Sequence, residues 1–221
     1  MSKAWKTLTR LPTDEGLLEL RQRGEQEFLI VIGGRILMTS VARRSEEALA
    51  TLACKHLDRA KSPRVLVGGL GMGYTLRALL DRLSDKSKVV VAELNPVVAE
   101  WCRGPLAPLT AGAVRDARVK IELGDVAEII SQAKAGSYNA ILLDLYEGPH
   151  AATQRHEDPF YGPTALARTH KALAKKGVFA VWAEEPDNRF ATRLKAAGFD
   201  TSTHRSGKGG RSHVIYLGIR T

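Results

Sequence analysis

Cysteine, aromatic residues and long apolar runs are all scarce in this chain of 221 residues. The two cysteines, Cys54 and Cys102, have neither metal-ligand nor redox-motif spacing, so we expect buried free thiols in a reducing compartment. No segment approaches the roughly 18 consecutive apolar residues of a membrane-spanning helix, and the start of the chain lacks the apolar stretch of a signal peptide. These absences predict a cytoplasmic protein with no metal site and no membrane partner.

Acidic residues are also in the minority, since 24 Asp and Glu face 33 Lys and Arg, for a formal net charge of +9. The last 21 residues contain no acid at all. A basic surface attracts anions, but a positive excess of this kind also serves general solubility. Nucleic acid therefore stays an alternative partner that the composition neither requires nor excludes. With 44% hydrophobic and 26% charged residues, the chain suits one folded domain with a small appendage.

The most informative stretch runs from residue 64 to residue 93. It reads R-V-L-V, then G-G-L-G-M-G, then the helix-forming Y-T-L-R-A-L-L and, after a polar break, K-V-V-V-A-E. Glycines at a strand-to-helix turn can adopt positive φ and bring bare N–H groups against a ligand. Glu93 follows the last glycine by about twenty residues, where a carboxylate can accept hydrogen bonds from both ribose hydroxyls. The stretch predicts the nucleoside-binding half of a doubly wound sheet.

The glycine spacing narrows the choice of nucleoside. Gly69, Gly71 and Gly73 form G-x-G-x-G, whereas the dinucleotide pattern G-x-G-x-x-G would need a glycine where Tyr74 stands. This spacing favours S-adenosylmethionine (SAM) over NAD. A plain tight turn is the alternative interpretation of the glycines alone.

Further acids follow the next two predicted strands. Asp125 comes after a strand at 119–123 and could accept from the adenine amine, while the backbone N–H of Val126 meets a ring nitrogen; Asp125 could equally cap the next helix. An apolar run at 139–143 suits a strand buried on both faces and delivers Asp144. Because ligands bind at the carboxyl ends of such strands, we expect Asp144 and Glu147 beside the glycine turn.

The rest of the chain alternates strands and helices. We expect a small β unit in residues 1–44, with strands at 17–21, 27–32 and 35–39, and then a transferase domain in residues 45–221. Ser45 is expected to cap a helix that ends before Pro63, and Gly177 to cap a helix at 163–175. A hairpin at 201–205 and 213–219 closes the chain. The pattern predicts an α/β, Rossmann-like sheet of seven strands with an antiparallel edge, typical of SAM-dependent methyltransferases.

The segment 145–162 is long, polar and aromatic, as lids and substrate walls often are. Its His150 and His156 could act as general bases or could simply be solvated loop residues.

The motifs of residues 64–182 resemble those of the spermidine synthases (polyamine aminopropyltransferases). The family's G-G-G-D-G-G-T-L-R is similar to residues 69–77, its G-D-A to residues 124–126, and its Y-D-x-I-x-x-D-x-x-D-P to residues 138–148. The resemblance implies SAM or decarboxylated SAM as cofactor, a small-molecule acceptor and a homodimer. From these motifs and their places at strand ends we assign the cofactor to Gly69, Gly71, Gly73, Glu93, Leu94, Asp125, Val126 and Asp144. The expected catalytic residues are Asp144, beside the amino group of the cofactor or the acceptor, and Glu147 and Tyr146, either of which could orient or deprotonate the acceptor.

Three departures from the family bear on the reaction. Met72 replaces an aspartate that faces the amino end of decarboxylated SAM, which removes an acid that would repel the carboxylate of intact SAM. Glu147 replaces the family's catalytic aspartate. Residues 43–48, R-R-S-E-E-A, replace the D-E-x-x-Y-H-E helix start that helps to hold a polyamine, so we expect few acids near the mouth of the site.

These departures favour a methyltransferase acting on a small-molecule acceptor. Two alternatives stay open. One is an aminopropyltransferase of altered specificity, and the second is a nucleoside-binding protein that lacks catalysis or acts through nucleic acid. The basic tip at 208–211 motivates the second alternative.

Overall fold

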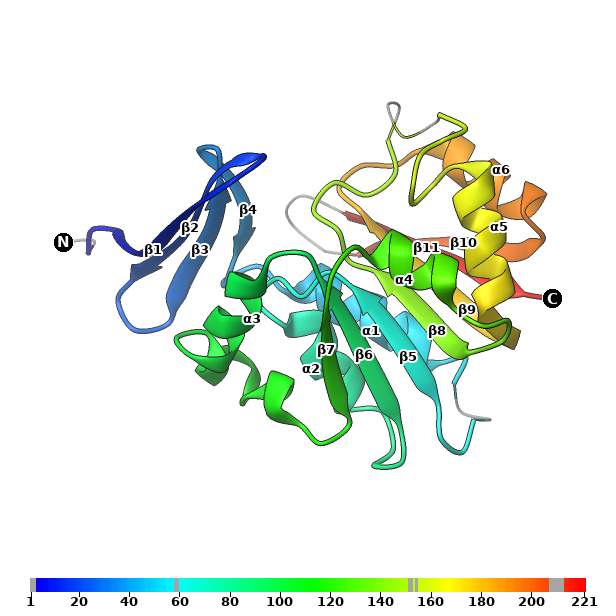
Figure 1. The fold of residues 1–221 in the computed structure, drawn as a ribbon, viewed down its shortest axis with the longest axis horizontal. Helices are drawn as coiled ribbons and strands as arrows, with labels where there is room; N and C mark the ends of the chain where they lie inside the picture. The colour runs from blue at the N-terminus through cyan, green and yellow to red at the C-terminus, as the bar shows by residue number, and fades with distance from the viewer. Residues whose placement is uncertain (1–2, 58–59, 151–152, 154, 207–212) are drawn as a thin grey trace.

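The computed structural model describes residues 3–57, 60–150, 153, 155–206 and 213–221. A small antiparallel sheet opens the chain and stands to one side of the main body (Figure 1). Its strands are in sequence order: β1 (Lys6–Thr13), β2 (Gly16–Arg23), β3 (Glu27–Ile32) and β4 (Arg35–Thr39). Strand β1 was not predicted, because K-T-L-T-R-L-P-T lacks strict alternation and contains a proline.

The main sheet has seven strands in the order β10-β11-β9-β8-β5-β6-β7. They are β5 (Arg64–Gly68), β6 (Lys88–Glu93), β7 (Val119–Leu123), β8 (Tyr138–Leu143), β9 (Leu173–Ala183), β10 (Phe199–Ser206) and β11 (His213–Arg220). Strands β5 to β9 are parallel, and β11 runs antiparallel to both of its neighbours. The predicted seven-stranded α/β fold is confirmed, but the antiparallel strand lies one place inside the edge. The strand order reverses between β5 and β8.

Helices cover both faces of this sheet (Figure 1). One buried cluster joins the sheet to α1 (Arg44–Cys54), α2 (Tyr74–Leu80) and α3 (Pro96–Arg103). The second cluster joins it to α4 (Val126–Gln132), α5 (Pro163–Ala172) and α6 (Asn188–Ala196). Neighbouring residues of β5 belong to different clusters, Val65 and Val67 to the first and Leu66 to the second. A strand whose successive side chains are all buried requires cover on both faces.

Two predicted helix caps are wrong. Helix α1 begins at Arg44 without a side-chain cap, and Ser45, inside the helix, donates its hydroxyl to Glu46. Helix α5 ends at Ala172, and Gly177 lies within β9 instead of capping a helix. A Cβ at Gly177 would come 2.8 Å from the carbonyl oxygen of Ala174. Glycine is therefore required there for close backbone packing, a need that looks like a cap in the sequence.

The small sheet shares the hydrophobic core of the larger one. Its side chains Leu18, Leu20, Phe28 and Ile30 belong to the same buried cluster as α1, α2 and α3. The hydroxyl of Tyr74 also donates to the carbonyl oxygen of Ser40 at 2.9 Å. A boundary at residues 44 and 45 stays a prediction, and we propose that the two parts unfold together.

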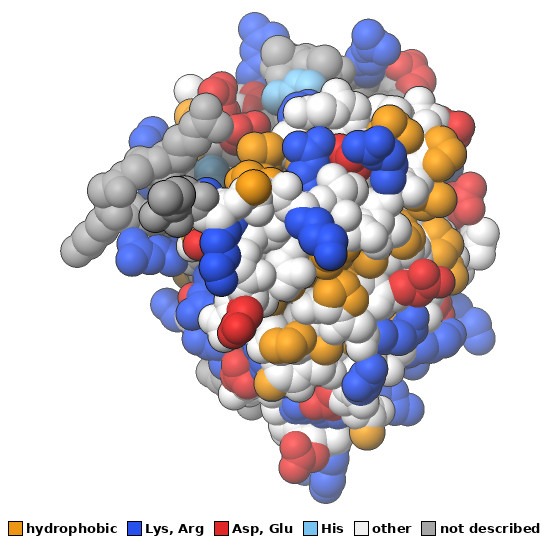
Figure 2. All heavy atoms as spheres, turned by 90° about the vertical axis from the view of Figure 1, so that its left-hand side faces the viewer, with side chains coloured by type: hydrophobic (Ala, Val, Ile, Leu, Met, Phe, Trp, Pro, Cys, Tyr) orange, Lys and Arg blue, Asp and Glu red, His pale blue; other side chains and the backbone are white. Residues whose placement is uncertain are grey.

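The outward side of the small sheet is a mixed surface. Lys and Arg side chains lie scattered among acidic and apolar ones on this side instead of gathering into one patch (Figure 2). In the described part of the chain, no helix is both long enough and apolar enough to cross a membrane.

Leu20→Ala tests the shared core. Leu20 has no exposed surface, so the cavity should cost about 2 to 5 kcal/mol in the free energy of unfolding. Urea unfolding followed by circular dichroism should show one transition at a lower midpoint. Leu17→Ala, on the same strand but 46% exposed, is the matched control and should change little. Two transitions, of which only the smaller responds to Leu20→Ala, would contradict the shared core.

Candidate active site

The glycine turn after β5 lies where the order of strands reverses, and backbone contacts hold it there. Gly69 N–H donates to the carbonyl oxygen of Ala92 at 2.9 Å, and Asp144 N–H donates to that of Gly68 at 2.9 Å. Gly69 has φ +90°, and a Cβ on it would lie 2.5 Å from the carbonyl oxygen of Asp144. Only glycine fits between the ends of these strands, as the motif predicted.

Glu93 ends β6 and is only 7% exposed. One carboxylate oxygen accepts from Leu70 N–H at 2.9 Å and the other from Asn95 N–H at 2.8 Å. Burial raises the pKa of Glu93, and these backbone donors oppose that rise. The carboxylate is thereby fixed against the glycine turn, with lone pairs left for further donors. Its contact with ribose stays a prediction.

Two apolar side chains stand exposed beside Glu93. Leu94 is 63% exposed, and Leu123, at the end of the neighbouring strand β7, is 59% exposed. Exposed leucines at the ligand-binding edge of a doubly wound sheet suit the face of an adenine. Leu123 was not among the predicted site residues, because a leucine that ends a strand looks like part of the core in the sequence.

Asp125 begins α4, and its carboxylate accepts from Ala127 N–H at 2.8 Å. The helix-cap interpretation of Asp125 is therefore confirmed. Its contact with adenine, and that of the N–H of buried Val126, stay predictions.

Asp144 directly follows β8 and faces α2. The hydroxyl of Thr75 donates to its Oδ2 at 2.5 Å. Burial and, secondly, the nearby charge of Glu46 raise the pKa of Asp144 to about 7, while the Thr75 hydrogen bond opposes the rise. A carboxyl group that titrates near neutrality can both accept and release a proton at working pH, as a general base must.

Tyr146 and Glu147 lie further along the same loop, and an arginine of the small sheet holds both. Arg35 pairs with Glu147 at 2.8 Å, and its guanidinium lies 4.8 Å from the centre of the Tyr146 ring. His150 lies 3.2 Å from the other oxygen of Glu147, whereas His156 is exposed. The sequence could not reveal Arg35, because it stands 112 positions from Glu147.

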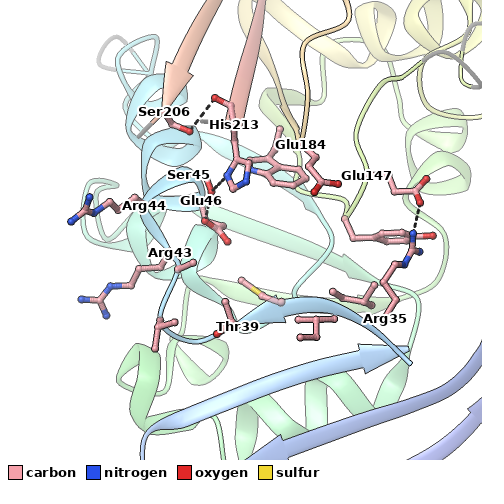
Figure 3. A pocket seen from close by; sticks show the side chains of 17 residues that line it. Arg35, Thr39, Arg43, Arg44, Ser45, Glu46, Glu147, Glu184, Ser206 and His213 are labelled. Carbon is pink, nitrogen blue, oxygen red and sulfur yellow. Dashed lines mark hydrogen bonds and ion pairs between the residues drawn. The ribbon is translucent and has the colours of Figure 1, made fainter. Parts of the chain in front are cut away.

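A cleft of about 700 Å³ opens between β4, the start of α1, the loop after β8 and the ends of β9, β10 and β11 (Figure 3). Glu46, Glu147 and Glu184 line it, so the expectation of few acids near its mouth is wrong. Three arginines also line it, but Figure 3 shows Arg43 and Arg44 pointing away from its interior. Arg43 pairs with Glu47 at 3.2 Å.

The interpretation of Met72 needs correction. Met72 has no exposed surface and packs in the core, so its side chain does not face the cleft. Met38 of β4 lines the cleft instead, and its sulfur lies 3.3 Å from the backbone nitrogen of Met72 and close to Gly71. The glycine turn still has no acid at the family's aspartate position. The side chain that covers it, however, comes from the small sheet.

Gly69→Ala tests the close approach of the strand ends. The added methyl group meets the Asp144 carbonyl, so we expect the unfolding free energy to fall by about 1 to 3 kcal/mol more than in Gly24→Ala. Gly24 also has positive φ, but a Cβ there meets nothing within 4 Å, so this control isolates the backbone strain. Urea unfolding of both variants makes the comparison, and equal losses would contradict the packing argument.

Several known proteins are similar to this chain in sequence, in fold or in both. The family model described as "Spermine/spermidine synthase domain" matches residues 42–191. Putrescine N-methyltransferase 1 of Nicotiana tabacum is 35% identical over 132 residues, which are 58% of this chain and 33% of that protein. The polyamine aminopropyltransferase of Prochlorococcus marinus is 29% identical over 153 residues, 68% of this chain and 51% of that protein.

The chain thus spans about a third of the length of the tobacco relative that it matches. The crystal structure of spermidine synthase from Thermotoga maritima superposes with a TM-score of 0.79 at 18% identity, covering 98% of this chain and 73% of that one. This likeness confirms the fold, and the family match covers α1 to α6 almost completely. The chain belongs to the spermine/spermidine synthase family.

Proposed function

We propose that this protein transfers a methyl group from SAM to an amine. The observation that carries the proposal is the meeting of the glycine turn, Glu93 and Asp144 at the point where the strand order reverses, directly beside an acid-lined cleft. The glycine turn and the two acids suit an adenosyl cofactor, and the cleft suits a cationic small molecule.

The residues present fit the proposed cofactor. The fixed carboxylate of Glu93 can accept from ribose, the exposed Leu94 and Leu123 can cover adenine, and the turn at Gly69, Gly71 and Gly73 offers backbone to the methionyl part. When bound, SAM supplies an electrophilic carbon attached to a positively charged sulfur. The protein has to align a nucleophile with that carbon and to remove a proton from the nucleophile.

Asp144 is proposed as the group that takes this proton. An ammonium that enters the cleft cannot attack until it becomes an amine, and Asp144 can accept the proton near neutral pH. Thr75 holds the carboxylate in place through Oδ2 and leaves its second oxygen for the acceptor. Tyr146 and Glu147, held by Arg35, would form the wall that orients the acceptor.

Aminopropyl transfer from decarboxylated SAM is the second candidate reaction. The similarity to an aminopropyltransferase and to a spermidine synthase structure favours it. Two observations favour methyl transfer: the higher identity to a putrescine N-methyltransferase and the absence of an acid in the glycine turn. The acid-lined cleft supports an amine under either reaction.

The proposed compartment of this enzyme is the cytoplasm, and its proposed oligomeric state is a homodimer. Both cysteines are buried thiols outside any disulfide, as a reducing compartment allows. The homodimer rests on resemblance to the family alone. Nucleic acid has no part in the proposal, and the basic tip at 208–211 that motivated it lies outside the described residues.

A product assay tests the reaction. The protein is incubated with putrescine and either SAM or decarboxylated SAM, and the products are identified by mass spectrometry. We expect N-methylated amine from SAM, and Asp144→Asn should lower kcat by about 10² to 10⁴-fold because the general base is lost. Asp200→Asn, an exposed acid on β10, is the control and should leave the rate unchanged.

If decarboxylated SAM gives an aminopropylated product and SAM gives no methylated product, methyl transfer is contradicted and aminopropyl transfer takes its place. Absence of any transfer would contradict the proposal.

A further inference from the structure

Glu147 occupies the position of the family's second loop acid, but its charge is already engaged. Arg35 donates to one of its oxygens at 2.8 Å, and His150 lies 3.2 Å from the other. All three side chains are about half exposed at the rim of the cleft, and Figure 3 shows the Arg35–Glu147 pair at one end of it. A carboxylate neutralised by a guanidinium is a weak partner for a second cation.

Glu46 enters the same cleft from the first turn of α1. Its carboxylate accepts from the Ser45 hydroxyl at 2.7 Å, and in the described part of the chain it forms no ion pair with lysine or arginine. Figure 3 shows this carboxylate pointing into the cleft, away from the arginines that precede it. Glu46 therefore presents negative charge to whatever the cleft holds.

The position of Ser45 is itself fixed by distant parts of the chain. Ser45 is buried, and its hydroxyl lies 3.0 Å from Nδ1 of His213 on β11. The His213 ring in turn lies 4.9 Å from the ring of Trp182 on β9. The hydroxyl that orients Glu46 is thus held by the main sheet.

The backbone of Glu46 and the carboxylate of Asp144 both contact the hydroxyl of Thr75. Thr75 Oγ1 lies 2.5 Å from Oδ2 of Asp144 and 3.4 Å from the backbone oxygen of Glu46. Burial is the main cause of the raised pKa of Asp144, and the charge of Glu46 is the second, so the two acids are near enough for their charges to interact. Like charges so placed repel, and a bound cation relieves the repulsion.

We propose that Glu46, together with Asp144, holds the ammonium group of the acceptor, while the Arg35–Glu147 pair forms a neutral end wall. The inference rests on the proposed function and names the cation-binding residues of that site. The ligand class is an alkyl ammonium, whose carbon chain would lie along the aromatic rings of Trp182 and Tyr146. Glu46 would therefore set the affinity for the ammonium group of the acceptor, while the Arg35–Glu147 pair would bound one end of the cleft.

Calorimetric titration with putrescine tests this assignment. The wild type, Glu46→Gln and Glu47→Gln are compared with S-adenosylhomocysteine saturating the cofactor site. We expect Glu46→Gln to weaken putrescine binding by about tenfold or more, equivalent to about 1.4 kcal/mol, because one of two carboxylates loses its charge. Glu47→Gln is the matched control, with the same change of charge in the same helical turn but on a carboxylate that pairs with Arg43, and should weaken putrescine binding by less than about threefold.

Ser45→Ala is a second variant that leaves both acids in place. It removes the hydroxyl that orients Glu46, so it should weaken putrescine binding without changing the binding of S-adenosylhomocysteine. Equal affinity of wild type and Glu46→Gln, or an equal loss in Glu47→Gln, would overturn the assignment.

The assignment and the proposed function fail in different ways. If the wild type binds S-adenosylhomocysteine but not putrescine, the ammonium assignment is wrong and the adenosyl site stands. If the wild type does not bind S-adenosylhomocysteine, the proposed transferase is contradicted and the assignment falls with it.

Discussion

Close backbone contact among three parallel strands is the constraint on which the site depends. Gly69 bonds to the end of β6, Gly68 bonds to the start of the loop after β8, and no side chain fits at Gly69. This contact puts the glycine turn, the acid that ends β6 and the acid that follows β8 at one edge of the sheet. The buried carboxylate of Glu93 then ties the turn to the next segment through two backbone N–H groups. The proposed cofactor and acceptor sites are neighbours because the strands that carry their residues are neighbours in the sheet.

The parts of this arrangement that depend on local sequence were predictable. Strand β5, the glycine turn, helix α2 and strand β6 are consecutive in the chain, and each has a strong local signal. The seven-stranded sheet followed from the alternation of strands and helices. The helix caps predicted at Ser45 and Gly177 were wrong, because the residue type alone suggested a cap and tertiary packing gives each residue another role. The Ser45 hydroxyl contacts the side chains of Glu46 and His213, and Gly177 packs against the backbone of Ala174 and Asn139.

The cleft was much less predictable, since its walls come from segments far apart in the chain. Arg35 and Met38 come from the small sheet, Trp182 from β9 and His213 from β11. None of them stands near the glycine motif in the sequence. Met72, which does, is buried in the core. The net charge of +9 also led to the wrong expectation that few acids lie near the cleft. Three glutamates line the cleft, and its arginines point away from it or form ion pairs. Net charge describes the whole surface, whereas a binding site depends on the few charges that face it.

Calorimetric titration of the purified, ligand-free protein with SAM and, separately, with decarboxylated SAM tests the central claim most directly. The account predicts that SAM binds, and binds more tightly than decarboxylated SAM, because no acid of the glycine turn repels its carboxylate. A preference for decarboxylated SAM of about tenfold, or about 1.4 kcal/mol, would contradict the methyl-transfer reaction. Absence of binding by either compound would contradict the adenosyl site itself.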